Sequence, residues 1–330
     1  MRKILAFLTI ALVAVSCKGT RTLLPNVSGK AGEVIVVVEK SYWEGNLGDE
    51  VRGLLAADFP FLPQREPLYT LVNVIPTGFT DLFKVHRNIV KIDINPQAAS
   101  FGVKYFKDVW SSPQCVIQIS AADGQSAIEM LQKEGKQIIN TIEQAERDRI
   151  IHNSILYEEK SIAPQVAAAF GGSPHFPSGY KLMKKTDDFI WIADVKQHTN
   201  QGILIYKYPA SGQNDLSVDN IIAHRNEILK NNVPGMFDNT YMTTGTFFTP
   251  SVEYVKYNGR SFAQTRGLWE VENDFMGGPF VSHSFYSLDG NDIIVLDAFV
   301  YAAGLDKRHY LRQVESIIYS WEWKDKENKQ

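Results

Sequence analysis

The sequence is poor in cysteine: only Cys17 and Cys115 occur among its 330 residues. It also lacks any uncharged apolar run of the roughly 20 residues that a helix needs to cross a bilayer. Two cysteines exclude a disulfide-rich scaffold. Cys115 shares one face of an alternating segment with Ile117 and Ile119. That pattern predicts a buried core thiol, with a free reactive thiol as the alternative.

Recognised catalytic motifs are missing as well. The chain has no G-x-S-x-G, Walker loop, dinucleotide-binding glycine pattern or H-E-x-x-H, and its seven histidines are scattered. We therefore expect no cofactor and no metal site. The formal net charge of −3 gives the chain no general attraction for phosphate backbones, so nucleic acid is excluded as a partner.

The N-terminus has the features of an export signal. Arg2 and Lys3 precede an apolar stretch at residues 4–15, which is too short to span a membrane, so residues 1–16 are expected to be a signal peptide. The stretch ends in Ala14-Val15-Ser16-Cys17, which resembles the bacterial lipobox, with Ala14 where Leu is usual. The resemblance implies that the Cys17 thiol carries diacylglycerol and that its amine is acylated with a fatty acid such as palmitate. The alternative is an ordinary secretory signal with an incidental cysteine.

Residues 17–31 are expected to be a flexible lipidated tether, because Lys18-Gly19-Thr20-Arg21 leads into a stretch with Pro25, Ser28 and Gly29. No acidic run follows Cys17, and such a run is what surface-export signals of related lipoproteins look like. We therefore expect a body that faces the periplasm from the outer membrane.

The length indicates two domains. Residues 32–150 form the first, with strands expected at 34–38, 68–75, 88–94 and 115–120 and a helix from Asn46. The pattern Ser126-Ala127-Ile128-Glu129 matches a capping box and opens a long amphipathic helix. Its apolar stripe fits either the helix's own sheet or, as an alternative, a coiled-coil partner.

A helical connector is expected at 151–178, kinked by Pro164 and stopped at Gly171. Residues 179–330 form the second domain, with strands at 189–195 and 202–208 and a helix capped by Ser217. Tyr257-Asn258-Gly259-Arg260 predicts a hairpin, and a strand at 293–301 leads into a closing helix.

These patterns predict an α+β protein of two domains, each a mainly antiparallel sheet flanked by helices. The element order of the second domain resembles the three-layer sandwich of the PsbP and Mog1 type.

One strand carries the main candidate surface. By alternation, Gly267, Trp269 and Val271 share a face that we expect a helix to cover, and the opposite face presents a row of charged residues. With the glycine loop that follows, this row is a candidate binding surface; a solvated strand face is the alternative. The surface comprises Arg260, Arg266, Glu270, Glu272, Met276, Gly277, Gly278, Pro279 and Phe280.

Two further hypotheses concern chemistry and membranes. His283 between Ser282 and Ser284, or the carboxylates of Glu270 and Glu272, could serve an envelope hydrolase acting on glycan or peptide; a polar strand histidine is the alternative. Residues 101–110 mix aromatic residues with lysines. This mixture suits a membrane or glycan contact, or a short amphipathic helix on the sheet.

The whole chain resembles an uncharacterised lipoprotein family of the Bacteroidota, domain of unknown function 4837. The resemblance implies a lipoprotein but brings no catalytic residues. We therefore expect a non-catalytic periplasmic binding or envelope-assembly protein, with an envelope protein or glycan as partner. The residues that carry the resemblance are Leu24-Pro25-Asn26-Val27-Ser28-Gly29, Arg87-Asn88-Ile89, Arg266-Gly267-Leu268-Trp269-Glu270 and Met276-Gly277-Gly278-Pro279-Phe280.

Overall fold

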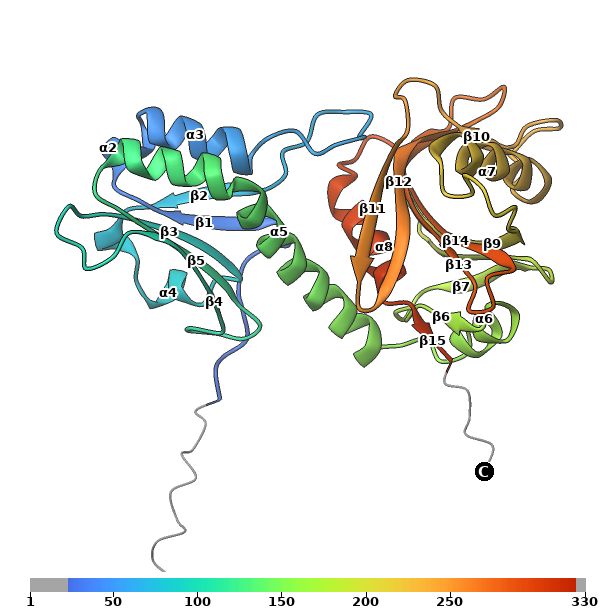
Figure 1. Cartoon of the computed structure of the whole chain (residues 1–330), viewed down its shortest axis with the longest axis horizontal. Helices are drawn as coiled ribbons and strands as arrows, with labels where there is room; N and C mark the ends of the chain where they lie inside the picture. Colours follow the sequence, from blue (N-terminus) through green and yellow to red (C-terminus); the bar gives the residue numbers. More distant parts are fainter. Residues whose placement is uncertain (1–22, 325–330) are drawn as a thin grey trace, which may run out of the picture.

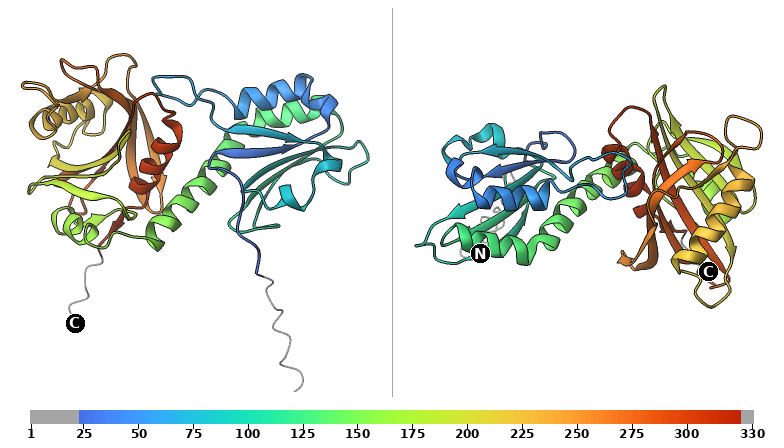
Figure 2. Two further views of the ribbon diagram at one scale, coloured as in Figure 1. Left: turned by 180° about the vertical axis from the view of Figure 1, so that it is seen from behind. Right: turned by 90° about the horizontal axis from the view of Figure 1, so that it is seen from above.

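The structure, a computed structural model, describes residues 23–324. The expected signal peptide at 1–16 and the acylation site Cys17 lie outside the described residues. Two units, one on each side of a long helix, make up the chain (Figures 1 and 2). That helix is α5 (Gly124–Leu156), and it runs from the first unit into the second. The predicted α+β architecture is confirmed.

The first unit contains a five-stranded sheet in the order β2-β1-β3-β5-β4. The strands are β1 (Glu33–Val37), β2 (Thr70–Val74), β3 (Asn88–Ile94), β4 (Gly102–Lys107) and β5 (Cys115–Ala121). Every pair is parallel except β4 with β5. The expectation of a mainly antiparallel sheet is therefore wrong for this unit. The reason is that side-chain alternation is the same in both kinds of sheet and does not reveal strand direction.

Both faces of this sheet are covered, as a parallel sheet requires. On one face, Val34 and Val36 pack against α3 (Asn46–Leu55) and α5. On the other, Ile35 and Val37 contact the segment that contains η1 (Pro76–Gly78) and α4 (Asp81–Lys84). The short α2 (Lys40–Trp43) precedes α3. Cys115 is buried in this core, and burial raises the pKa of its thiol to about 11, as expected of a structural cysteine.

The part of the expected tether that the structure describes is held by hydrogen bonds. The backbone of Ser28 donates to Val85 and accepts from Arg87, and Ser112 donates to Pro25. Gly29 has φ of +88°, and a side chain there would overlap the ring of His86. Residues 25–31 are thus fastened along the first unit, which corrects the prediction of a flexible segment from 17 to 31.

The long helix α5 begins one turn earlier than the capping box predicted. Its N-cap is Asp123, whose carboxylate accepts from the backbone N–H of Ser126, so Ser126 lies inside the helix. Leu131, Ile138 and Ile142 pack on the sheet of the first unit. The described residues therefore support the helix-on-sheet alternative for this stripe.

The connector differs from its prediction at one position. Pro164 lies in the first turn of α6 (Ala163–Phe170), where its missing N–H leaves no helical hydrogen bond unmade, so it starts this helix and kinks none. Gly171 ends α6 in the left-handed conformation, as predicted.

The second unit contains an eight-stranded antiparallel sheet of β7–β14 in the order β10-β12-β13-β14-β9-β8-β7, with β11 also paired to β12. The hairpin at Asn258-Gly259 joins β11 to β12 as predicted. The strands are β7 (Lys181–Lys185), β8 (Phe189–Val195), β9 (Thr199–Pro209), β10 (Met242–Thr244), β11 (Ser251–Tyr257), β12 (Arg260–Val271), β13 (Gly277–Tyr286) and β14 (Asp292–Ala302).

Helices lie on both faces of this sheet, giving three layers (Figure 1). One face packs against α7 (Val218–Asn232), which Ser217 caps as predicted. The other packs against α8 (Arg308–Tyr319). After α8, β15 (Glu322–Trp323) pairs with β6 (Gly172–Ser173) and fastens the C-terminal segment beside α6.

Candidate functional site

The strand with the predicted charged row is β12, and both of its faces are covered. Trp269 and Val271 pack in one core with Leu229 and Val233 at the end of α7. This confirms a helix over that face. Phe262 on the opposite face packs in the core that α8 closes. The alternation was interpreted correctly, but the sequence pattern does not show that α8 covers the charged face.

The four charged residues of the row do not lie on one surface. Arg266 forms an ion pair with Glu315 of α8, 2.5 Å away, and is largely withdrawn from solvent. Arg260 is buried at the hairpin end of β12, whereas Glu270 and Glu272 lie at the other end. A continuous exposed strip is therefore absent, and the two ends of β12 border separate hollows.

A hollow of about 460 Å³ opens beside the Glu270 end. We call it the loop hollow. It lies between the connection from β10 to β11, the turn from β12 to β13, and a loop of the first unit that contributes Pro63. Its wall includes Phe247, Glu270, Asp274, Phe275, Met276 and Gly278. Glu270, Met276, Gly277 and Gly278 of the predicted surface thus come together here.

The floor of the loop hollow is rigid. Trp269 is buried, and its indole N–H donates to the carbonyl of Val300 at 3.2 Å. A side chain at position 278 would overlap that same carbonyl oxygen. Glycine is therefore required at Gly278 for β13 to approach β14 this closely. Pro279 and Phe280 of the predicted surface are buried and do not line the hollow.

The carboxylates of the loop hollow have no cationic partners among residues 23–324. Glu270 is half-buried and takes part in no ion pair there. Asp274 accepts only the backbone N–H of Phe275, at 2.6 Å. Glu272 is exposed and points outside the hollow's wall. The hollow is consequently acidic.

Large aromatic side chains flank these acids. Phe275 is fully exposed, and 77% of Phe247 is exposed. Phe247 packs edge-on against Phe248, with their ring centroids 4.7 Å apart. Phe248 in turn packs edge-on against Phe61 from the first unit, with ring centroids 6.0 Å apart. Phe247 and Phe275 were not among the residues predicted from the sequence. The one available signal was the Phe247-Phe248 pair in a loop between Gly245 and Pro250.

The hydrolase constellation is not assembled in the described chain. Ser282 and Ser284 face α7, whereas His283 faces α8, so the neighbouring serines cannot hydrogen bond to the imidazole. All three residues are fully buried. Burial, with Arg260 nearby, holds the pKa of His283 well below its ordinary value. His283 is therefore a neutral core residue between Phe262 and Tyr319. It lies on β13 opposite Gln264 of β12, whereas Glu270 is near the far end of β12.

Neither a metal-binding cluster nor a membrane-spanning helix is found among residues 23–324. Residues 23–324 contain no cluster of three or more histidine, cysteine, aspartate or glutamate side chains that could hold a metal ion. Over the same range, none of the helices combines the length and the apolar character needed to cross a bilayer.

The segment 101–110 forms no helix. It contains β4, an edge strand on which Val103 and Tyr105 pack inward and Lys104 and Phe106 point outward. The prediction of an amphipathic helix is wrong because this alternation has a period of two. The lysines place charge on an exposed sheet edge, where they oppose pairing with another strand.

Comparison with known proteins identifies two domains. Residues 159–320 match the family described as Domain of unknown function (DUF4837), and residues 27–154 match Domain of unknown function (DUF8532). The two matches meet near the end of α5, where the first unit passes into the second. No curated protein matches the sequence.

Two solved structures show a partial likeness. One is a protein from Bacteroides thetaiotaomicron VPI-5482, with 16% identity over 47% of this chain and a TM-score of 0.27. The chain covers 46% of that protein's length. The other is the lipid transfer and protein localization domain of human StarD13, with 10% identity over 43% of this chain and 89% of that domain, and a TM-score of 0.22. At these scores neither likeness carries an argument.

Proposed function

We propose that this chain is a lipid-anchored binding protein of the bacterial envelope, and that its loop hollow docks a cationic segment of a partner protein. One observation carries the proposal: two exposed aromatic rings, Phe247 and Phe275, flank the carboxylates of Glu270 and Asp274, which no cation neutralises within residues 23–324.

The exposed aromatic rings and the acidic side chains of the loop hollow favour a cationic protein segment as partner. Exposed apolar side chains gathered around a hollow mark interaction sites, because burying them on binding releases water. A lysine or arginine of the partner would contact both the aromatic rings and the carboxylates, through cation–π and ionic interactions. The same acids would repel an anionic membrane surface, so a protein segment fits better than a lipid one.

The proposed anchor is the acylated thiol of Cys17, in the outer membrane with the body in the periplasm. Because residues 25–31 are fastened to the first unit, at most the segment from Cys17 to Leu24 could separate the acylated thiol from it. Fully extended, that segment reaches about 25 Å. The chain enters the first unit from below in Figure 1, whereas the loops beside β10 are at the top. The loop hollow would then face away from the anchoring membrane.

In-cell crosslinking tests the docking surface. A photoreactive amino acid is placed at position 275 or 247 of the full-length lipoprotein, and at position 288 as a matched control, because Leu288 is also exposed but lies on another turn. We expect one protein crosslinked from 275 and 247 and not from 288. We also expect the crosslink to weaken with salt and to be lost on combined Glu270→Gln and Asp274→Asn substitution.

Three outcomes would refute the proposed docking surface. These are the same species captured from position 288, a protein crosslink that survives neutralisation of both acids, and a crosslink to glycan or lipid alone. The anchor is tested separately, by fractionation of a Cys17→Ala variant and by feeding cells labelled palmitate. Retention of the variant in membranes, or an unlabelled wild-type protein, would disprove lipidation at this thiol.

A further inference from the structure

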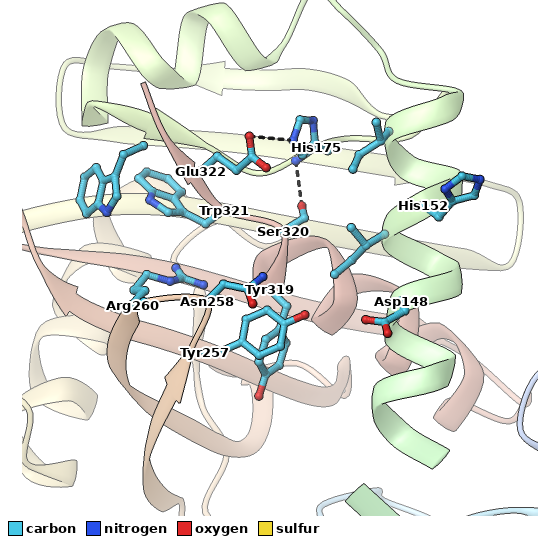
Figure 3. A pocket seen from close by; sticks show the side chains of 14 residues that line it. Asp148, His152, His175, Tyr257, Asn258, Arg260, Tyr319, Ser320, Trp321 and Glu322 are labelled. Atoms are coloured by element: carbon cyan, nitrogen blue, oxygen red, sulfur yellow. Dashed lines mark hydrogen bonds and ion pairs between the residues drawn. The ribbon is translucent and has the colours of Figure 1, made fainter. Parts of the chain in front are cut away.

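A second hollow, of about 700 Å³, lies at the hairpin end of β12 (Figure 3). We call it the hairpin pocket. It is bounded by the C-terminal half of α5, the turn between β11 and β12, and the segment that follows α8. Its lining includes Ile151, Ile155, Tyr257, Arg260, Trp321 and Trp323. The volume is in the range typical of small-molecule sites.

Arg260 is the unusual feature of this pocket. It is only 9% exposed, and no carboxylate among residues 23–324 forms an ion pair with it. Nη2 donates to the carbonyl of Ile318 at 3.1 Å, but Nη1 is buried and has no acceptor. The guanidinium lies instead 4.8 Å from the ring of Phe262 and 4.6 Å from that of Phe285. One carbonyl and two cation–π contacts offset only part of the cost of burying a charge that has no carboxylate partner.

The other buried arginines among residues 23–324 differ from Arg260, because a carboxylate neutralises the charge of each. Each of them has a carboxylate partner: Arg149 pairs with Glu146, Arg225 with Asp297, and Arg312 with Glu143. The half-buried Arg266 likewise pairs with Glu315. Burial lowers the pKa of Arg260 to about 10, which still leaves it protonated at neutral pH. Arg260 therefore carries a positive charge that no carboxylate neutralises among residues 23–324.

Trp321 supplies a second unused donor in the same place. It is 7% exposed, and its indole N–H has no acceptor, although buried tryptophans usually find one. Its ring is held between Phe285 at 5.4 Å and Trp323 at 5.3 Å. Figure 3 shows Trp321 and Arg260 on the same side of the pocket. Two residues that line the same side of one pocket thus each carry a buried donor with no acceptor.

We infer that Arg260 and Trp321 form a binding site for the carboxylate of a small organic acid. The carboxylate oxygens accept from Arg260 Nη1 and Trp321 Nε1, and the apolar part of the ligand packs against Tyr257, Ile151 and Trp323. Both donor atoms are buried, so binding requires lining side chains of the pocket to move.

Surrounding charges favour a single negative charge on the ligand. Asp148 and Glu322 are exposed at the pocket, and neither forms an ion pair with an arginine or lysine in the described range. They would repel a doubly charged phosphate more strongly than a monoanion. One guanidinium also balances one carboxylate. The chemical class is therefore an apolar monocarboxylate, such as an acylated amino acid.

Fluorescence titration of the full-length lipoprotein tests the site. The probes are N-acetyl-L-phenylalanine, its uncharged amide and phenyl phosphate. We expect a saturable change in tryptophan fluorescence with the carboxylate only, and a loss of that change in Trp321→Phe. Arg260→Met should weaken binding at least about tenfold, because a hydrogen bond to a charged group is lost. Arg65→Met, a change at an exposed arginine, is the matched control and should bind normally.

The unfolding stability of an Arg260→Met variant distinguishes a binding role of Arg260 from a structural one. Without ligand, Arg260→Met should unfold at the same or higher denaturant concentration than wild type, since it removes an uncompensated buried charge. The inference is overturned if no probe binds saturably, if the amide binds as well as the acid, if phenyl phosphate binds more tightly, or if Arg260→Met binds normally. A destabilised Arg260→Met protein would also overturn it, because the arginine would then serve the fold.

Discussion

The carboxylate of Glu66 accepts hydrogen bonds from the backbone N–H of Lys307 at 2.7 Å and from that of Arg308 at 2.9 Å. Glu66 lies in the loop between α3 and β2 of the first unit, whereas Lys307 is the N-cap position of α8 in the second. The Lys307 side chain makes no capping hydrogen bond of its own. A helix of one unit is therefore capped by an acid of the other, which joins the two units.

We predict that Glu66→Ala destabilises the protein by about 1–2 kcal/mol, because two backbone donors at a buried helix start lose their acceptor. Urea unfolding measures the change. Glu39→Ala is the control, since Glu39 is exposed at the start of α2 and its side chain makes no cap. Equal losses in the two variants would show that Glu66 is not a functioning cap.

His283 should make the fold sensitive to mild acid. Burial, followed by the nearby Arg260, keeps the pKa of its imidazole well below 6.5, whereas the unfolded chain takes up a proton near 6.5. Below that pH the unfolded state binds more protons than the folded one. The free energy of unfolding should thus decrease as pH falls from 7 to 5, by at most about 1.4 kcal/mol per pH unit.

The matched variant is His283→Phe, because its ring keeps the aromatic contacts with Phe262 and Tyr319 and cannot be protonated. The difference in unfolding free energy between wild type and variant, measured by urea titration at several pH values, isolates this one group. An unchanged difference between pH 7 and pH 5 would contradict the assignment of His283 as neutral in the folded state.

Any side chain at position 278, where Gly278 stands, should destabilise the protein. Gly278→Ala places a methyl group onto the carbonyl oxygen of Val300, so we expect a loss of about 1–3 kcal/mol and a distorted loop hollow. Gly53→Ala offers a control of opposite sign. Gly53 lies inside α3 with open space around it, and alanine there should stabilise by roughly 0.5–1 kcal/mol. Thermal unfolding of both variants would show whether the two shifts have opposite signs.

Local patterns predicted individual elements well. The strands at 88–94 and 189–195 and the hairpin at Asn258-Gly259 follow from alternation and turn chemistry, which act over a few residues. The direction of strand pairing did not follow. The apolar run in β1 indicated a strand buried on both faces, but a parallel partner is chosen by connections that the periodicity does not encode.

The candidate sites were harder to predict than the elements. Alternation sorted β12 into two faces correctly, but whether a face is exposed depends on α8, which comes later in the chain. Arg260 and Trp321 are far apart in sequence and line one pocket because the end of α8 lies against the hairpin end of β12. No spacing rule links such residues, so the hairpin pocket had no signal in the sequence.

The buried pair of Arg225 and Asp297 should be strongly coupled. Their side chains meet at 2.7 Å with no exposure to solvent, and Arg225 also donates to Thr244 at 2.8 Å. Arg225→Met leaves the Asp297 carboxylate buried without a counter-charge, so we expect a loss of about 3–5 kcal/mol. Thr244 keeps a hydrogen bond to Asn226 and adds little to that loss.

Removing both charges should cost much less than removing one. In the double variant Arg225→Met with Asp297→Leu, no uncompensated charge remains, and replacing a buried ion pair by apolar side chains is often close to neutral. A double-mutant cycle in urea measures the coupling. Additive losses from the two single variants would show that the ion pair does not interact as the geometry indicates. A recovery in the double variant would show that the pair is retained for something other than stability, such as the alignment of α7 on the sheet.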